Sequence, residues 1–374
     1  MQVNLAYLLN RPTGTTQYAL NLLPYLKALS PDFLATPASG LPLGSYTAVP
    51  ANMTAAEGIK GHLRRLAWTQ FQVPQLCSSL CEAERHSQHD RKPLLFSPIP
   101  EAPLFSSIPS VVMFHDLIPL RFPQFFGAIK LFYRYYVPQV LAQAERVLCN
   151  SEATARDIVS FYGIPAQKIV SIPLAYDADH FCPTPATPEV LQADLAIANK
   201  PYFLMLGRQA PYKNVGRVIE ALSQVKPDCV LLIAGPIDER YTPDLIEQAE
   251  SFGVRPRIKF LSYVPYHQLP GLLSGAIALV FPSLWEGFGL PVLEAMACGT
   301  PVICANVASL PEVAGDAALL IDPLAVSAIA GAMNRVLTDD LLRSQLKTAG
   351  LQRARQFSWE KTGQATVEVL RQYL

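Results

Sequence analysis

Short apolar runs alternate with helix-length amphipathic segments along most of the 374 residues, and this rhythm constrains the fold more than any other feature. Strands separated by helices in this way build parallel sheets with crossover helices. We expect strands at 3–9, 94–96, 111–114, 146–149, 169–172, 202–206, 230–234, 258–260, 277–281, 302–303 and 318–321. We expect helices at 18–29, 59–71, 128–142, 153–162, 215–224, 243–252, 267–273, 291–297, 324–337 and 340–356, and a flexible loop or helix end at 76–92. The sequence therefore predicts an α/β protein.

The rhythm is interrupted once, around 172–195, where Pro173, Pro183, Pro185 and Pro188 break regular structure. At roughly 150 residues per domain, the chain is long enough for two domains. We expect a Rossmann-like N-terminal domain over 1–175 and a Rossmann-like C-terminal domain over 176–356. Ligands of open parallel sheets bind at the carboxyl ends of the strands, so the loops there are the candidate sites.

The composition excludes several classes of protein. The 30 basic and 30 acidic residues balance, so the chain lacks the basic excess of a nucleic-acid binder. Half of the residues are hydrophobic and 16% are charged, which excludes general disorder. The most apolar stretch, 272–282, is shorter than the about 20 residues of a membrane span. The first residues carry no basic leader, and the seven cysteines lack zinc-site spacing. We therefore expect a cytoplasmic protein with reduced thiols.

The most specific motif follows the expected strand 277–281. The loop Gly287–Gly289 leads into a helix with Pro291 in its first turn, where proline is favoured. Loop amides and the helix dipole form an anion site there. Glu286 and Glu294 flank this site, which suits a ligand that carries hydroxyls beside a phosphate, as sugars and riboses do. The alternative is that Glu294 is a surface residue and the glycines only form a turn.

A second motif, Gly-Arg-Gln-Ala-Pro-Tyr-Lys-Asn, follows the expected strand 202–206. Arg208 and Lys213 place two cations in one loop at a carboxyl strand end, which suits a diphosphate. The loop matches neither G-x-G-x-x-G nor G-x-x-x-x-G-K-[ST], which weakens dinucleotide-binding and nucleoside-triphosphatase interpretations. Solvated loop cations are the alternative.

Three further positions are weaker candidates. Gly14 and Thr15 open the first helix, where glycine allows close backbone approach to a ligand, although an ordinary capped turn has the same pattern. His115 follows the strand 111–114, so we expect it to face a ligand. Asp177 and Asp179 form a D-x-D sequence like that of metal-dependent sugar transferases, but they lie between the domains, so a turn is favoured over a metal site.

Two aromatic stretches, 60–71 and 125–137, also carry cations. Helices of this composition can lie in a membrane interface, so peripheral membrane contact is one interpretation. Core helices with one cationic edge and an acceptor-binding wall are the others. The cations concerned are Lys60, Arg64, Arg65, Lys130 and Arg134.

The Glu286…Glu294 block and the Gly-Arg…Lys-Asn loop resemble family 4 of the retaining nucleotide-sugar glycosyltransferases, also described as glycosyl transferases group 1, which have the GT-B fold. The resemblance covers essentially the whole chain and includes 147–152 and 261–273. It implies two Rossmann-like parallel-sheet domains that face each other across a cleft. It also implies a final helix, within 357–374, that crosses back onto the N-terminal domain.

The resemblance implies the following roles. Arg208 and Lys213 hold the donor diphosphate, Glu286 and His115 contact the transferred sugar, and Glu294 binds the ribose hydroxyls. Further donor contacts are implied for Gly14, Thr15, Tyr263, Val264, Gly287, Phe288, Gly289 and Leu290. No metal or other cofactor is needed. The closest subgroup reads Thr-Gly-Ile-Gly-Arg-Tyr where this chain has Thr-Gly-Thr-Thr-Gln-Tyr at 13–18, which leaves the geometry of that loop and the choice of acceptor open.

The resemblance thus implies a metal-independent, retaining hexosyltransferase. We expect the donor to be a nucleotide-diphosphate sugar, with a UDP-hexose such as UDP-glucose favoured. We expect the acceptor to be a saccharide or lipid-linked saccharide in cell-surface polysaccharide synthesis. The alternatives are a GDP-mannose-dependent mannosyltransferase of the same fold, a nucleotide-sugar epimerase or hydrolase, and a catalytically silent partner subunit.

Overall fold

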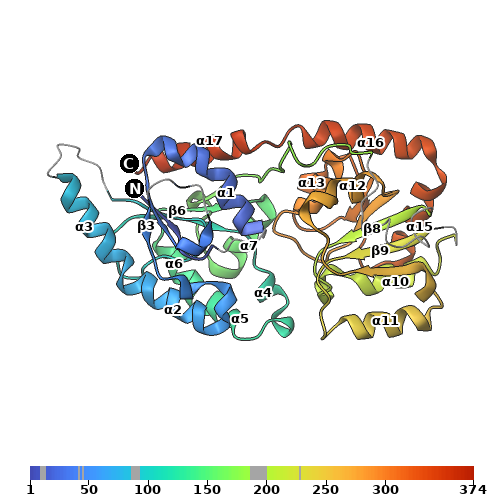
Figure 1. Cartoon of the computed structure of the whole chain (residues 1–374), viewed down its shortest axis with the longest axis horizontal. Helices are drawn as coiled ribbons and strands as arrows, with labels where there is room; N and C mark the ends of the chain where they lie inside the picture. The colour runs from blue at the N-terminus through green and yellow to red at the C-terminus, as the bar shows by residue number, and fades with distance from the viewer. Residues whose placement is uncertain (9–13, 41–42, 44–45, 86–92, 186–199, 227–228) are drawn as a thin grey trace. The chain divides into compact units, whose positions relative to one another are not determined.

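The computed structural model describes residues 1–8, 14–40, 43, 46–85, 93–185, 200–226 and 229–374. The chain divides into two compact units (Figure 1). Unit 1 consists of Met1–Leu174 and Trp359–Leu374, and unit 2 consists of Ala175–Ser358. Each unit contains one parallel sheet, so the predicted α/β fold with two Rossmann-like sheets is confirmed.

Unit 1 contains a seven-stranded parallel sheet in the order β3-β2-β1-β4-β5-β6-β7. Its strands are β1 (Gln2–Leu5), β2 (Asp32–Ala35), β3 (Thr47–Ala48), β4 (Leu95–Ser97), β5 (Ser110–Phe114), β6 (Arg146–Cys149) and β7 (Ile169–Ser171). Its α-helices are α1 (Gly14–Leu26), α2 (Gly58–Phe71), α3 (Val73–Arg85), α4 (Ile118–Arg121), α5 (Ile129–Leu131), α6 (Val137–Gln143), α7 (Glu152–Tyr162) and α17 (Trp359–Arg371). A π-helix, η6 (Phe132–Tyr136), joins α5 to α6. Short 3₁₀ turns are η1 (Lys27–Leu29), η2 (Pro37–Ser39), η3 (Ala51–Met53), η4 (Ala55–Glu57), η5 (Pro123–Phe125) and η7 (Ala166–Lys168).

Unit 2 contains a six-stranded parallel sheet in the order β10-β9-β8-β11-β12-β13. Its strands are β8 (Tyr202–Leu206), β9 (Val230–Ala234), β10 (Ile258–Leu261), β11 (Ala278–Phe281), β12 (Val302–Ala305) and β13 (Leu319–Ile321). Its α-helices are α10 (Val215–Leu222), α11 (Thr242–Ser251), α12 (Leu269–Ser274), α13 (Leu290–Ala297), α14 (Leu310–Ala314), α15 (Val326–Thr338) and α16 (Asp340–Ala354). Its 3₁₀ turns are η8 (Pro211–Lys213), η9 (Arg255–Arg257) and η10 (Tyr266–Gln268).

The strand order places a topological switch point in each sheet. In unit 2 the chain runs outward from β8 through β9 to β10 and then returns to β11 on the other side of β8. In unit 1 it runs from β1 through β2 to β3 and returns to β4. Loops at the carboxyl ends of the strands beside such a point form a crevice that binds ligands. The loops after β8 and β11 in unit 2, and after β1 and β4 in unit 1, are therefore the candidate ligand-binding loops.

The helix α17 belongs to unit 1 although it follows unit 2 in the sequence. It packs on α1, where a Cβ at Gly363 would lie 2.3 Å from the ring of Tyr25. The Thr362 hydroxyl donates to the Pro173 carbonyl at 2.8 Å, and the rings of Trp359 and Tyr18 lie 6.4 Å apart. The last helix thus completes the core of the first unit.

The segment 76–92 differs from its prediction. We expected a loop or helix end over 76–92, but α3 extends over Val73–Arg85, and 86–92 lie outside the described residues. Val73 and Cys77, one helical turn apart, are fully buried. Ser78 and Ser79, which follow Cys77, face solvent and donate to the carbonyls of Pro74 and Gln75 one turn earlier, and these polar residues hid the helical pattern.

Candidate active site

A small pocket lies at the carboxyl ends of β8 and β11, beside the switch point of unit 2. Arg208 and Lys213 reach it from the loop after β8, and Pro282 and Ser283 reach it from the loop after β11. The complete lining is Met205, Leu206, Gly207, Arg208, Lys213, Val215, Ile233, Phe281, Pro282 and Ser283. The two cations singled out from the sequence as diphosphate contacts therefore line the same pocket.

Lys213 forms an ion pair with Glu286, which lies in the loop after β11, with 2.5 Å between Nζ and Oε1. The ammonium also lies 5.2 Å from the centre of the Phe281 ring and 5.5 Å from that of Tyr212. Both charged side chains are largely shielded from solvent, at 17% and 11% exposure. A charge-assisted pair in such surroundings is strong and fixes the position of the ammonium. Lys213, the proposed phosphate contact, is thus paired directly with Glu286, the proposed sugar contact.

The loop after β8 is anchored by Asn214, which the sequence motif contains but to which we assigned no role. Asn214 is buried and adopts a left-handed backbone conformation, with φ of 64°. Its side-chain amide donates to the carbonyls of Pro282 and Pro323, at 3.1 and 2.6 Å. In addition, the backbone N–H of Leu284 donates to the Tyr212 carbonyl at 2.8 Å. These bonds clamp together the two loops that carry Lys213 and Glu286.

Close backbone contact at this edge requires glycine at 235, directly after β9. Gly235 has φ of 156°, and a Cβ there would lie 1.9 Å from the carbonyl oxygen of Gly207. The N–H of Gly207 donates to the Ala234 carbonyl at 2.9 Å. A side chain at position 235 would therefore displace the backbone just before Arg208.

The Gly287–Gly289 loop is held from behind by Ser309, which precedes α14 and which the sequence analysis missed. The Ser309 hydroxyl is fully buried and lies 2.9 Å from the Glu286 carbonyl oxygen and 2.8 Å from that of Phe288. In a planar trans peptide the N–H points opposite to the preceding C=O. With the Phe288 carbonyl directed at Ser309, the N–H of Gly289 is directed away from Ser309.

Gly289, the residue directly before α13, has φ of 103°, and a Cβ there would lie 2.6 Å from the Leu310 side chain. Leu290 is the first residue of α13. The helix N-terminus and its positive dipole end therefore follow directly on the loop, as the motif predicted.

Glu294 lies one turn into α13 and is half-buried. Burial raises the pKa of its carboxyl to about 7. Its charge contributes to the raised pKa of Tyr266, in the loop after β10, so the two side chains are electrostatically coupled. That loop also contains Tyr263, which is exposed, and Val264, which is buried. The proposed ribose contact and the proposed base contacts therefore lie on neighbouring elements of unit 2.

The other predicted residues belong to unit 1. His115 follows β5, and its ring, with the proton on Nε2, donates to the Pro98 carbonyl at 3.0 Å and packs edge-on against Tyr18. Burial lowers the pKa of His115 to about 4, so the ring is neutral at physiological pH. Gly14, exposed, and Thr15, half-buried, begin α1. The preceding loop residues 9–13 lie outside the described residues.

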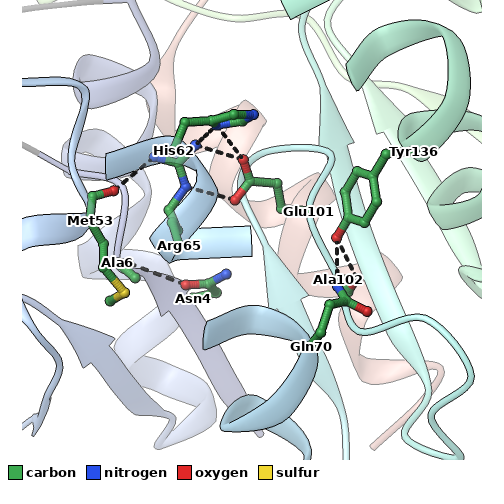
Figure 2. A network of polar contacts seen from close by, with 9 residues as sticks. All are labelled: Asn4, Ala6, Met53, His62, Arg65, Gln70, Glu101, Ala102 and Tyr136. Atoms are coloured by element: carbon green, nitrogen blue, oxygen red, sulfur yellow. Dashed lines mark hydrogen bonds and ion pairs between the residues drawn. The ribbon is translucent and has the colours of Figure 1, made fainter. Parts of the chain in front are cut away.

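A buried polar network lies at the carboxyl ends of β1 and β4 (Figure 2). Arg65 of α2 binds both carboxylate oxygens of Glu101 at 2.7 Å and donates to the Met53 carbonyl at 3.0 Å and to Nδ1 of His62 at 2.9 Å. Arg65 is 8% exposed and Glu101 2%. From the sequence we grouped Arg65 with the cations of the aromatic stretches 60–71 and 125–137; the structure places it in the interior of unit 1.

Asp177, the first residue of the D-x-D sequence, is part of a turn. Its Oδ1 accepts hydrogen bonds from the backbone N–H groups of Asp179 and His180, each at 3.2 Å. This agrees with the turn that we expected. Within the described part of the chain, no three His, Cys, Asp or Glu side chains are grouped so as to hold a metal ion.

Comparison with known proteins identifies the family. The family described as Glycosyl transferases group 1 matches residues 189–353, and Glycosyltransferase Family 4 matches 89–180. The chain is 34% identical to O-antigen chain mannosyltransferase B of Escherichia coli over 264 residues. The aligned region covers 69% of this chain and 69% of that protein. The chain belongs to glycosyltransferase family 4. This glycosyltransferase is also 28% identical to the serotype-specific mannosyltransferase WbdA of Escherichia coli, over 69% of this chain and 33% of WbdA.

The fold of this family 4 glycosyltransferase is the GT-B fold. A solved structure of HepE from Anabaena in complex with UDP-glucose superposes with a TM-score of 0.74 and 18% identity, over the whole of both chains. Among the described helices of this glycosyltransferase, none has the length and apolar character that a membrane span requires.

Proposed function

We propose that this glycosyltransferase transfers a mannosyl residue from GDP-mannose to a saccharide acceptor in the synthesis of a cell-surface polysaccharide, with retention of anomeric configuration and without a metal. The 34% identity to an O-antigen chain mannosyltransferase supports mannose over the UDP-glucose that we favoured from the sequence. The likeness to HepE with UDP-glucose, at 18% identity, concerns the fold alone. The observation that supports donor binding most directly is the pocket lined by Arg208 and Lys213.

The proposed chemistry depends on stabilising the departing diphosphate. Negative charge grows on this group as the glycosidic bond breaks, and fixed cations and amides directed at it lower the barrier. We assign this role to Arg208, Lys213 and the N–H groups of Gly289 and Leu290. Glu286 holds Lys213 in place and offers its remaining oxygen lone pairs to sugar hydroxyls.

We further propose that the acceptor attacks on the face from which the phosphate leaves, and that a phosphate oxygen takes the acceptor proton. Both new and old bonds then lie on one face of the sugar, so the configuration is retained. Because His115 is neutral at physiological pH, it serves in this proposal as a hydrogen-bonding group toward the sugar and not as an acid.

Two measurements test the donor and the reaction. A ligand that binds only the folded protein adds RT ln(1 + [L]/Kd) to stability, about 2.7 kcal/mol at 100 times Kd. GDP is expected to raise the melting temperature more than UDP at equal concentration. A larger rise with UDP would support a UDP-sugar as the donor instead. With GDP-mannose present, mannose is expected on an added saccharide acceptor. Accumulation of free mannose or of an epimer instead would support the hydrolase or epimerase alternative.

Replacing Ser309 with alanine is expected to weaken donor binding about tenfold, because the carbonyls of Glu286 and Phe288 lose the group that orients them. The measurement is Kd for GDP-mannose by calorimetry. Ser151→Ala is the matched control, since Ser151 caps α7 in unit 1 through the N–H of Thr154, and losing a cap also costs about 1 kcal/mol. If both variants lose stability equally but neither changes Kd, Ser309 has no positioning role.

Donor affinity is expected to rise about tenfold between pH 6 and pH 8. Glu294 has a pKa of about 7 without ligand, and hydroxyls that donate to its carboxylate favour the charged form. Binding therefore releases a proton and is stronger where the carboxylate is already ionised. A nucleotide-sugar is the correct probe because its diphosphate does not titrate in this range. Glu294→Gln should remove the pH dependence; an unchanged dependence in that variant would assign it to another group.

A further inference from the structure

Two helical stretches of unit 1 lie side by side. The ring of His62, on α2, packs edge-on against Phe132, on η6, with 4.8 Å between their centres. Farther along both helices, the Gln70 side chain donates to the Tyr136 hydroxyl at 3.0 Å (Figure 2). The stretch from α5 through η6 to α6 therefore lies along α2, with Phe132 and Tyr136 on the side that faces α2.

The other sides of both stretches expose large apolar residues. On α2, Ile59 and Leu63 are one turn apart and are 66% and 58% exposed. On α5 and η6, Leu131 and Tyr135 are 51% and 61% exposed. Each of these side chains remains exposed with the whole described chain present. We call this surface the α2–η6 face.

The same face is strongly basic. Lys60, Arg64, Lys130 and Arg134 are exposed, and Glu57 is the only acidic residue in the segments 57–71 and 129–143. Glu57 forms an ion pair with Arg64, with 3.9 Å between Oε2 and Nη1. Four exposed cations against one acid give the face a net charge of +3, although the 30 basic and 30 acidic residues of the whole chain balance.

An aromatic side chain is also held out into solvent at the far end of α2. Phe105 is 95% exposed and has φ of 59°, a conformation that is costly for a bulky residue. Two glutamines fix this loop: Gln70 of α2 accepts from the N–H of Leu104 at 2.8 Å, and Gln143 of α6 accepts from the N–H of Phe105 at 3.0 Å. Gln143 also donates to the Pro103 carbonyl at 3.1 Å. The backbone that presents the exposed phenyl ring is therefore held by specific hydrogen bonds.

We propose that the α2–η6 face, together with Phe105, rests on the surface of an anionic lipid bilayer. Cations beside apolar and aromatic side chains suit such a surface, since the rings and aliphatic chains enter the headgroup region while the cations meet lipid phosphates. A second copy of the chain fits less well, because a symmetric contact would oppose two faces of net charge +3.

Sedimentation with lipid vesicles tests this proposal, with the whole 374-residue chain and no nucleotide, so the result is independent of the transferase proposal. The probe is phosphatidylcholine vesicles with 30% phosphatidylglycerol, compared with pure phosphatidylcholine. We expect binding to the anionic vesicles that falls steeply between 50 and 500 mM salt, because exposed charges are screened. Equal binding to both vesicle types, or no binding to either, would overturn the proposal.

Variants locate the contact. Lys130→Gln with Arg134→Gln is expected to weaken the partition coefficient about 30-fold, and Phe105→Ser about tenfold. The matched control is Arg335→Gln with Lys347→Gln, which removes two exposed cations from unit 2 and should change it less than twofold. Equal losses in the control, or a concentration-dependent dimer in sedimentation velocity that Leu63→Ser abolishes, would assign the face to another role. Unchanged melting temperatures show that the variants are folded.

Discussion

Replacing Lys213 with alanine is expected to lower kcat at least 100-fold. The ammonium lines the pocket at the carboxyl ends of β8 and β11, and a cation fixed in that place stabilises a departing phosphate without reorganising. The loss should fall mainly on kcat, because the charge on the phosphate is greatest in the transition state. Arg208→Ala, on the same loop, should have a comparable effect. Initial rates of mannosyl transfer at saturating donor measure both.

Lys213→Ala also leaves the Glu286 carboxylate without its partner, so a fall in rate could come from local collapse. Lys213→Met with Glu286→Gln removes both charges and should be as inactive as the single variant while retaining the melting temperature. The matched control is Arg240→Ala. Arg240 is an exposed cation paired with Asp238 at 2.7 Å after β9, and its loss should leave the rate within twofold. Near-normal rates in both Arg208→Ala and Lys213→Ala would exclude the proposed diphosphate site.

Replacing Glu101 with glutamine is expected to destabilise unit 1 by about 3–5 kcal/mol. The reason is that Arg65, 8% exposed, would remain charged in the interior with no carboxylate to compensate it. Chemical denaturation followed by hydrogen exchange in β1 and β4 measures the change. It should appear as a loss of protection in unit 1, with less effect on β8 and β9 in unit 2.

The neighbouring residue supplies the control. Arg64 is paired with Glu57 at 3.9 Å, but both side chains are 49% exposed, and such pairs contribute about 0–1 kcal/mol. Arg64→Ala should therefore barely change the unfolding free energy. Replacing both partners, Arg65→Met with Glu101→Leu, should recover much of the stability that Glu101→Gln loses. If Glu101→Gln and Arg64→Ala behave alike, the buried pair has no structural importance.

The buried strands were the most predictable part of the fold. The limits of β6, β8 and β9 agree with the apolar runs, since strands covered on both faces appear as continuous hydrophobic sequence. The strand β3 was missed because it has only two residues, and β2 was missed as well. The expected helix over 128–142 is present as three pieces, because the π-helix η6 inserts there, and periodicity does not reveal such a change of hydrogen bonding.

For the candidate site, the position of a residue directly after a strand predicted which side chains lie in the binding loops. It did not predict which residues hold those loops in place. Arg208 and Lys213 follow a strand directly, so topology alone predicted that they share an edge with Glu286. Ser309 and Asn214 act through carbonyl groups distant in sequence, and no motif marks such a contact. Arg65 looked like its exposed neighbour Arg64 because only the position of Glu101, 36 residues later, distinguishes them.

The return of α17 to unit 1 has a consequence for biosynthesis. The ribosome delivers residues 1–174 first, yet the helix that packs against Tyr25 and Tyr18 of α1 is translated only after the 184 residues of unit 2. During that interval the nascent first unit keeps an apolar flank of α1 uncovered, where chaperones can bind it. Maturation of the first unit to its final stability therefore waits until translation reaches the last helix.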